Sequence, residues 1–139
     1  MAIERTLAII KPDAVRRGFV GDILKQVQAA GLAVRGLRMM RLAASQAEAF
    51  YEVHRARPFY GSLCAYMSSG PVVIAVLEGE GAIARWRDLM GATDPAKAAP
   101  GTIRKLFGFD VEQNAVHGSD APETAAREIP FFFSALEIV

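Results

Sequence analysis

The chain has 139 residues, of which 52% are hydrophobic and 22% are charged, and this composition suits one globular domain with its own core. Its 16 basic and 15 acidic residues leave a net charge of +1, which excludes a bulk attraction to nucleic acid or to an anionic membrane. With a single cysteine, no signal-peptide pattern and no apolar run of the ~18 residues that span a bilayer, we expect one cytoplasmic domain over residues 1–139, with no membrane partner and no obligatory nucleic-acid partner.

The first half of the chain alternates strand-like and helix-like segments. TLAIIK, at residues 6–11, is a short isoleucine-rich run that predicts a buried strand. A helix is predicted in GDILKQVQAAG, with Gly31 as its C-terminal cap, and a second strand in LAVRGLRMMRL. Ser45 and Glu48 have the spacing of a capping box and predict the start of another helix. Cys64 is expected to be a small buried hydrophobic residue.

The second half predicts one more long strand, two helices and a loop. GPVVIAVLEG is the most strand-like stretch, over Val72–Leu77, and AIARWRDLMG predicts a helix that ends at Gly91. Residues 92–114 predict a long ordered loop, and such loops are usually functional. The remaining elements are a short strand around Val116 and a helix from Pro122 to Ile129, which Pro130 stops.

This order of elements predicts an α+β fold. We expect a ferredoxin-like split βαβ sandwich, in which an antiparallel sheet has helices packed on one face. No internal repeat, low-complexity tract or linker divides the chain.

One apparent motif is set aside. Residues 79–84, GEGAIA, match a dinucleotide-binding fingerprint between a strand and a helix. Glu78 and Glu80 flank the turn and would repel a pyrophosphate, so we interpret it as an ordinary strand-to-helix turn. No P-loop pattern is present either.

The segment HGSD admits two interpretations. In the first, Ser119 or Asp120 caps the helix that begins near Pro122, and Gly118 gives the backbone room. In the second, His117 is a nitrogen nucleophile beside a helix N-terminus, where free backbone N–H groups favour an anion. Other segments carry the basic residues Lys11, Arg87 and Arg104. Each alone is a solvated surface charge, but gathered around the histidine the three would bind a triphosphate.

Five segments together resemble the nucleoside diphosphate kinase family, in its short bacterial-type form. They are ERTLAIIKPDAV, RPFYGSLCAYMSSGPVV, GATDPAKAAPGTIR, NAVHGSD and AREIPFFF, and they cover essentially the whole chain in the family's order. The resemblance implies a ferredoxin-like fold and a ping-pong transfer of the γ-phosphoryl group of a nucleoside triphosphate, typically ATP, to a nucleoside diphosphate. It also implies Mg²⁺, held through the nucleotide phosphates, and a homo-oligomer, either a tetramer or a hexamer.

The same resemblance assigns roles to individual residues. His117 is implied as the phosphorylated nucleophile, and Glu128 as the carboxylate that orients it; Lys11 and Asn114 complete the implied catalytic group. The positions implied to contact the nucleotide are Lys11, Tyr51, Arg87, Thr93, Arg104 and Asn114, with Phe59 and Val111 on either side of the base and Leu63 beside it. A clamp of Phe59 and Val111 would make few hydrogen bonds to base edges, so broad base specificity is expected. Tyr51 either supports this site through its hydroxyl or belongs to the core.

Two small departures and two rival functions remain. Ala14 stands where glycine is common, and Trp86 is unusually bulky, so it either stacks on a neighbouring loop or packs at a subunit contact. One rival is a nucleotide-binding module without catalysis, which the presence of every implied functional group disfavours. The other is an oligomeric scaffold, for which the PFFF run at residues 130–133 offers an apolar contact.

Overall fold

A computed structural model describes residues 2–139 and contains one four-stranded antiparallel sheet. The strands lie in the order β2-β3-β1-β4, so that β1 is central and β2 and β4 are the edges. Their bounds are Ile3–Ile10 for β1, Ala33–Arg41 for β2, Pro71–Glu80 for β3 and Val116–Gly118 for β4. The ferredoxin-like α+β class is confirmed.

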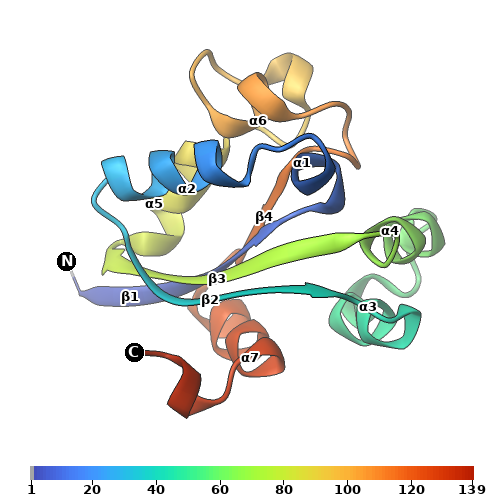
Figure 1. Ribbon diagram of the computed structural model, residues 1–139. Helices are drawn as coiled ribbons and strands as arrows, with labels where there is room; N and C mark the ends of the chain where they lie inside the picture. The colour runs from blue at the N-terminus through green and yellow to red at the C-terminus, as the bar shows by residue number, and fades with distance from the viewer. Residues whose placement is uncertain (1) are drawn as a thin grey trace.

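Helices cover both faces of this sheet, and the expectation of helices on one face is wrong. The sheet crosses the middle of Figure 1, with α2 and α5 above it and α7 below it. The α-helices are α1 (Pro12–Arg16), α2 (Val20–Ala29), α3 (Ala44–Phe50), α4 (Tyr60–Met67), α5 (Ala82–Met90), α6 (Ile103–Phe107) and α7 (Pro122–Phe132). Three short 3-10 helices occupy Glu52–His54, Pro95–Lys97 and Ala135–Glu137.

Two apolar clusters explain why the central strands are continuously apolar over Leu7–Ile10 and Val72–Leu77. Leu7 and Ile9 of β1 point into the cluster that includes residues of α3, α4 and α7. Ala8 and Ile10 point to the opposite face and into the cluster that includes residues of α2 and α5. Successive side chains of a strand alternate between faces, so a strand buried on both sides has no polar stripe.

Most predicted elements are confirmed, but three details are wrong. Helix α3 begins at Ala44, and its start is capped by Gln46, whose Oε1 accepts from the N–H of Ala43 at 2.8 Å; Ser45 lies inside the helix. The predicted loop at residues 92–114 contains α6 and a 3-10 helix. Helix α7 continues past Pro130 to Phe132, whose buried ring anchors the last turn in the core.

Among residues 2–139, no helix is both long enough and apolar enough to cross a membrane. Cys64 is buried and free, as expected.

Candidate active site

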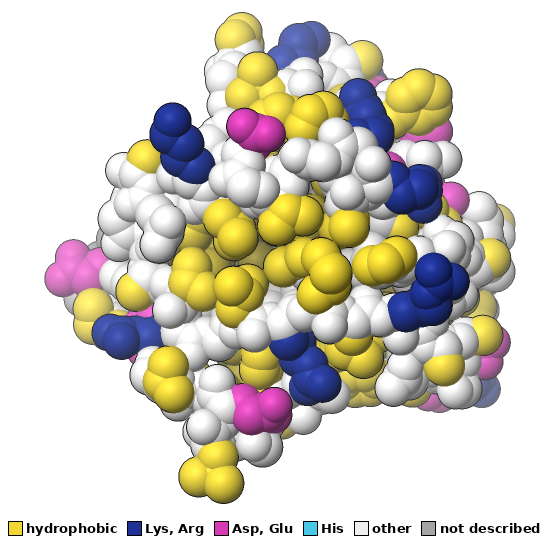
Figure 2. Space-filling view, viewed as in Figure 1, with side chains coloured by type: hydrophobic (Ala, Val, Ile, Leu, Met, Phe, Trp, Pro, Cys, Tyr) yellow, Lys and Arg dark blue, Asp and Glu magenta, His cyan; other side chains and the backbone are white. Residues whose placement is uncertain are grey.

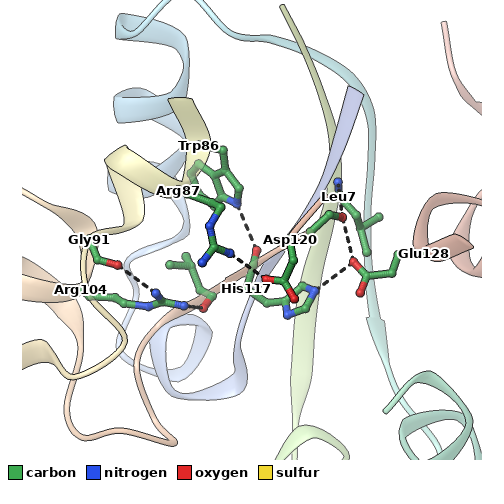
Figure 3. Close-up of polar contacts among 10 residues, drawn as sticks. Leu7, Trp86, Arg87, Gly91, Arg104, His117, Asp120 and Glu128 are labelled. Carbon is green, nitrogen blue, oxygen red and sulfur yellow. Dashed lines mark hydrogen bonds and ion pairs between the residues drawn. The ribbon is translucent and has the colours of Figure 1, made fainter. Parts of the chain in front are cut away.

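His117 lies on β4, the short edge strand beside β1. Its Cα is paired with that of Ile9, and its ring nitrogen Nε2 lies 3.1 Å from Oε1 of Glu128 on α7. An ionised carboxylate only accepts hydrogen bonds, so this contact assigns the proton of neutral His117 to Nε2 and the lone pair to Nδ1. Figure 3 shows His117 between Glu128 on one side and the Arg87–Asp120 pair on the other.

Glu128 is fixed from a second direction by Ser119. The Ser119 hydroxyl donates to Oε1 of Glu128 at 2.8 Å, and it accepts from the backbone N–H of Leu7 at 3.2 Å. Burial alone raises the pKa of Glu128, but hydrogen bonds and charge from His117, followed by the bond from Ser119, outweigh it and leave the pKa below its usual value. Glu128 is therefore a buried anion aimed at the imidazole.

The helix-cap interpretation of HGSD is wrong. The N-cap of α7 is Ala121, which makes no side-chain cap bond. Ser119 is instead fully buried against Glu128, and Asp120 forms an ion pair with Arg87 at 2.8 Å.

Trp86 holds the backbone of His117 from behind. It is fully buried in α5, and its indole N–H donates to the carbonyl oxygen of His117 at 3.1 Å. A Cβ atom at Gly118 would lie 2.6 Å from Cδ1 of Trp86, so only glycine allows this approach. Trp86 is thus a core residue that supports β4, and neither a loop stack nor a subunit contact is needed to explain it.

A cavity of about 390 Å³ gathers most of the residues implied to contact the nucleotide. Its walls are Lys11, Phe59, Leu63, Thr93, Arg104, Val111, Glu112 and Asn114. Phe59 and Val111 are 41% and 59% exposed, so both apolar side chains are accessible to a flat ligand at the cavity wall.

Lys11 and Asn114 form a bonded pair in this cavity. Nζ of Lys11 donates to Oδ1 of Asn114 at 2.8 Å, and Nδ2 of Asn114 donates to the carbonyls of Thr93 and Val111 at 3.0 Å each. Asn114 therefore ties together two loops as well as the lysine. Burial, followed by the charge of Arg104, lowers the pKa of Lys11 to about 8.

Arg104 reaches the cavity from α6 and is fixed by backbone carbonyls. Its two terminal nitrogens donate to the carbonyl oxygens of Gly91 and Val116 at 3.0 Å each, as Figure 3 shows for Gly91. Nε of Arg104 is buried without a partner among residues 2–139. Burial, followed by the nearby charge of Arg87, lowers the pKa of Arg104 to about 10.

Tyr51 belongs to the core and also faces the histidine. It is 5% exposed, and its ring meets that of His117 edge-on with centroids 6.2 Å apart. Its hydroxyl has no partner among residues 2–139, and burial raises the pKa of Tyr51 above its usual value. A smaller cavity of about 150 Å³ is lined by Tyr51, His117 and Glu128, among others. Tyr51 thus presents a neutral hydroxyl, and it lines the same small cavity as His117.

The pKa of Lys11 leads to a prediction about proton uptake. An anion bound beside Lys11 raises its pKa from about 8, so binding of ADP at about pH 8 should take up roughly half a proton, and ADP affinity should fall as the pH rises through 8. Between pH 8 and the unfolded value of ~10.4 the unfolded chain binds more protons, so the free energy of unfolding should rise with pH there.

Calorimetry of ADP binding in two buffers with different ionisation enthalpies measures this uptake. Lys11→Arg keeps the charge at every accessible pH and should abolish the uptake. Equal apparent enthalpies in both buffers for the parent protein would contradict the prediction.

Two residues of this region escaped the sequence analysis. Asp13 is buried and accepts a hydrogen bond from the backbone N–H of Ala115, and Tyr66 binds Asp13. The only sequence signal was the position of Asp13 directly after Lys11 and Pro12, because the partner residues lie far away along the chain.

The comparisons with known proteins agree with this geometry. The family model described as nucleoside diphosphate kinase matches residues 4–138. A nucleoside diphosphate kinase of Nitratidesulfovibrio vulgaris is 61% identical over 137 residues and covers 99% of both chains. One of Persephonella marina is 57% identical over 139 residues and covers 100% of this chain and 99% of its own.

Solved structures agree as well. The Aquifex aeolicus nucleoside diphosphate kinase superimposes with a TM-score of 0.97 at 52% identity, covering 99% of this chain and 100% of that one. A halophilic nucleoside diphosphate kinase of Halobacterium salinarum, solved in complex with CDP, gives 0.95 at 42% identity, covering 99% and 92%. With the fold, the histidine site and the full-length match in agreement, this chain belongs to the nucleoside diphosphate kinase family.

Proposed function

We propose that residues 1–139 form one kinase domain that transfers the γ-phosphoryl group of a nucleoside triphosphate to His117 and then to a nucleoside diphosphate. The observation that carries this proposal is the pairing of His117 Nε2 with Glu128, which leaves Nδ1 with a lone pair and without a hydrogen bond among residues 2–139. Membership of the nucleoside diphosphate kinase family supports the same reaction.

The reaction balances in two matching halves. In the first half, the lone pair of His117 Nδ1 attacks the γ-phosphorus, a nitrogen–phosphorus bond forms, and the bond from phosphorus to the β–γ bridging oxygen breaks. The nucleoside diphosphate leaves with that oxygen and its electron pair. In the second half, a terminal β-phosphate oxygen of the other nucleotide attacks the phosphorus and frees the histidine. The carboxylate of Glu128 stabilises positive charge that develops on the ring in either direction.

The cavity beside Asn114 is the proposed nucleotide site. Its Phe59–Val111 side takes the base, the Lys11–Asn114 pair takes the ribose, and Thr93 with Arg104 takes the phosphates. Arg87 completes the phosphate site when it exchanges its partner Asp120 for an anion. The Halobacterium relative was solved with CDP, which supports a nucleoside diphosphate as the ligand class here.

Mg²⁺ fits this site as a companion of the nucleotide. Among residues 2–139, no group of three or more His, Cys, Asp or Glu side chains is arranged to hold a metal ion, so the phosphate oxygens supply its main ligands. When bound, the ion would neutralise charge on the phosphates that Thr93, Arg104 and Arg87 hold.

Base specificity should be broad because the base contact is a stacking contact. Phe59→Ala should weaken the binding of purine and pyrimidine diphosphates by similar factors, about 5- to 150-fold for a stack worth ~1–3 kcal/mol. Titration calorimetry with ADP, GDP, CDP and UDP measures this. Phe109→Ala is the matched control, because Phe109 is 71% exposed and does not line the cavity. A loss confined to one base would contradict the clamp.

The activity itself is tested by mixing ATP and Mg²⁺ with GDP, CDP or UDP and separating the nucleotides. The expected result is formation of GTP, CTP and UTP at comparable rates, together with ADP. Binding of nucleotide without any transfer would contradict the proposal and favour the rival, a nucleotide-binding module without catalysis.

We further propose a homo-oligomer, either a tetramer or a hexamer, that pairs copies through β2. This strand is a sheet edge, and it carries the exposed side chains of Leu37 and Met39, which are 53% and 61% accessible. Figure 2 shows apolar side chains gathered across the middle of the face formed by α2 and β2. Long apolar edge strands are covered in native proteins, and a second copy offers the same strand. At this edge, the C-terminal Val139 makes a single backbone hydrogen bond to β2, in which its N–H donates to the carbonyl of Arg35.

Substitution of Leu37 and Met39 together by aspartate should break the contact through β2 and lower the mass of the oligomer, because like charges would meet across a two-fold contact. Sedimentation equilibrium measures the mass and assigns the tetramer or the hexamer of the parent protein. Val53→Asp is the control at another exposed apolar side chain, 69% accessible. A monomeric parent protein would overturn the assembly.

The free thiol of Cys64 accords with the cytoplasmic location that we also propose.

A further inference from the structure

A strained turn separates the nucleotide cavity from the nucleophile. Ala115 is the only residue other than glycine with positive φ among residues 2–139, at 75°. The carbonyl of Asn114 accepts from the N–H of Val116 at 2.9 Å, so Ala115 is the centre of a γ-turn of the rare, strained form. Asn114, which lines the cavity, precedes this turn directly, and His117 follows it two residues later.

Both peptide groups of Ala115 are held by residues at the start of α1. Its N–H donates to Oδ2 of Asp13 at 3.1 Å, and its carbonyl accepts from the N–H of Lys11 at 2.8 Å. Asp13 is 2% exposed, and its other oxygen accepts from the hydroxyl of Tyr66 on α4. The same hydroxyl accepts from the N–H of Asp13 at 3.1 Å. Every polar atom of this buried group is therefore engaged.

Such a turn needs this support because alanine resists positive φ. Glycine adopts the conformation without steric cost, whereas a residue with a Cβ keeps it only where its surroundings over-determine it. β4 is three residues long, so it contributes few hydrogen bonds of its own to hold its first residue in place. The Asp13–Tyr66 pair supplies the missing constraint from two other elements.

We propose that Asp13 and Tyr66 are positioning residues for phosphoryl transfer: they clamp the Ala115 turn and so fix His117 relative to the nucleotide held at Asn114. This inference rests on the proposed kinase function. Misplacement of reacting groups by about 1 Å costs on the order of 10²-fold in rate.

Asp13→Asn is the first test. Aspartate accepts from Ala115 and Tyr66 with two different oxygens, and asparagine places an amide nitrogen, which only donates, at one of these two positions. The rate of phosphoenzyme formation at saturating ATP, per folded molecule, should fall about 10²-fold. Val27→Ala is the control: Val27 is buried in α2 and lines neither the nucleotide cavity nor the cavity beside His117, so this variant should lose stability and keep its rate.

Ala115→Gly in the Asp13→Asn background is the decisive test. Glycine takes the positive φ without the clamp, so about tenfold or more of the lost rate should return. Asp13 also supports the charge of Lys11 by its own charge, but Ala115→Gly cannot restore a charge. Recovery of the transfer rate would therefore show that the loss came from the turn and not from the changed charge beside Lys11.

Tyr66→Phe keeps the carboxylate and serves if Asp13→Asn does not fold. It should slow transfer by roughly tenfold, and Ala115→Gly should again restore much of the loss. Parent rates in both clamp variants, or losses that Ala115→Gly leaves unchanged, would overturn the inference. An inactive parent protein would instead refute the proposed kinase function, so the two failures are distinguishable.

Discussion

His117→Ala is expected to abolish phosphoryl transfer while the fold is retained. The substitution removes the imidazole that Glu128 orients; His54 lines the same small cavity but makes no hydrogen bond to a carboxylate among residues 2–139. Loss of a covalent nucleophile typically leaves on the order of 10⁻⁴ of the rate or less. Formation of GTP from ATP and GDP measures the effect, and circular dichroism measures the fold.

The chain offers a matched control in its second histidine. His54 lies at the end of a 3-10 helix, and its ring stacks on Tyr51 with no hydrogen bond to a carboxylate among residues 2–139. His54→Ala should therefore retain most of the transfer rate. Transfer at the parent rate by His117→Ala would contradict the assignment of the nucleophile.

Glu128→Gln is expected to slow transfer by about 10²-fold while nucleotide affinity stays nearly unchanged. The amide keeps the shape and one acceptor oxygen, so Ser119 and His117 still find a partner. What is lost is the negative charge that stabilises a positively charged ring in the transition state. Because the side chain of Glu128 is only 4% exposed, little water is present to screen the ring's positive charge in place of the carboxylate.

Single-turnover measurement of phosphoenzyme formation, with ADP titration alongside it, separates rate from binding. Glu123→Gln is the control, because Glu123 lies in the first turn of the same helix and is exposed. An unchanged rate in Glu128→Gln would show that the carboxylate only holds α7 against β4.

The fold was predictable where its signal is local. The apolar runs of β1 and β3, the glycine that follows α2 and the glycine that ends α5 are all readable within a few residues. The number of covered faces is also readable, because an unbroken apolar run such as Val72–Leu77 of β3 is typical of a strand buried on both sides, and the expectation of helices on one face did not use this signal. By contrast, the extent of α7 past Pro130 depends on the burial of Phe132 in the core.

The candidate site divides in the same way. His117 was singled out by its motif, and Glu128 and the cavity residues by the family resemblance; the structure pairs His117 with Glu128 and brings most of the other residues into one cavity. The roles of Ser119 and Asp13 were invisible because they depend on hydrogen bonds between distant segments. Asp13 and Ala115 are 102 residues apart, and Leu7 and Ser119 are 112 apart. No spacing rule reaches that far along a chain.

The most direct test of the phosphohistidine mechanism is the intact mass of the parent protein after it is mixed with ATP and Mg²⁺. The sample is kept alkaline because phosphohistidine is labile in acid, and GDP is then added. The account predicts a gain of one phosphoryl group per chain, which disappears as GTP forms. An unchanged mass, with ATP bound in the cavity at Lys11 and Asn114, would contradict transfer through His117.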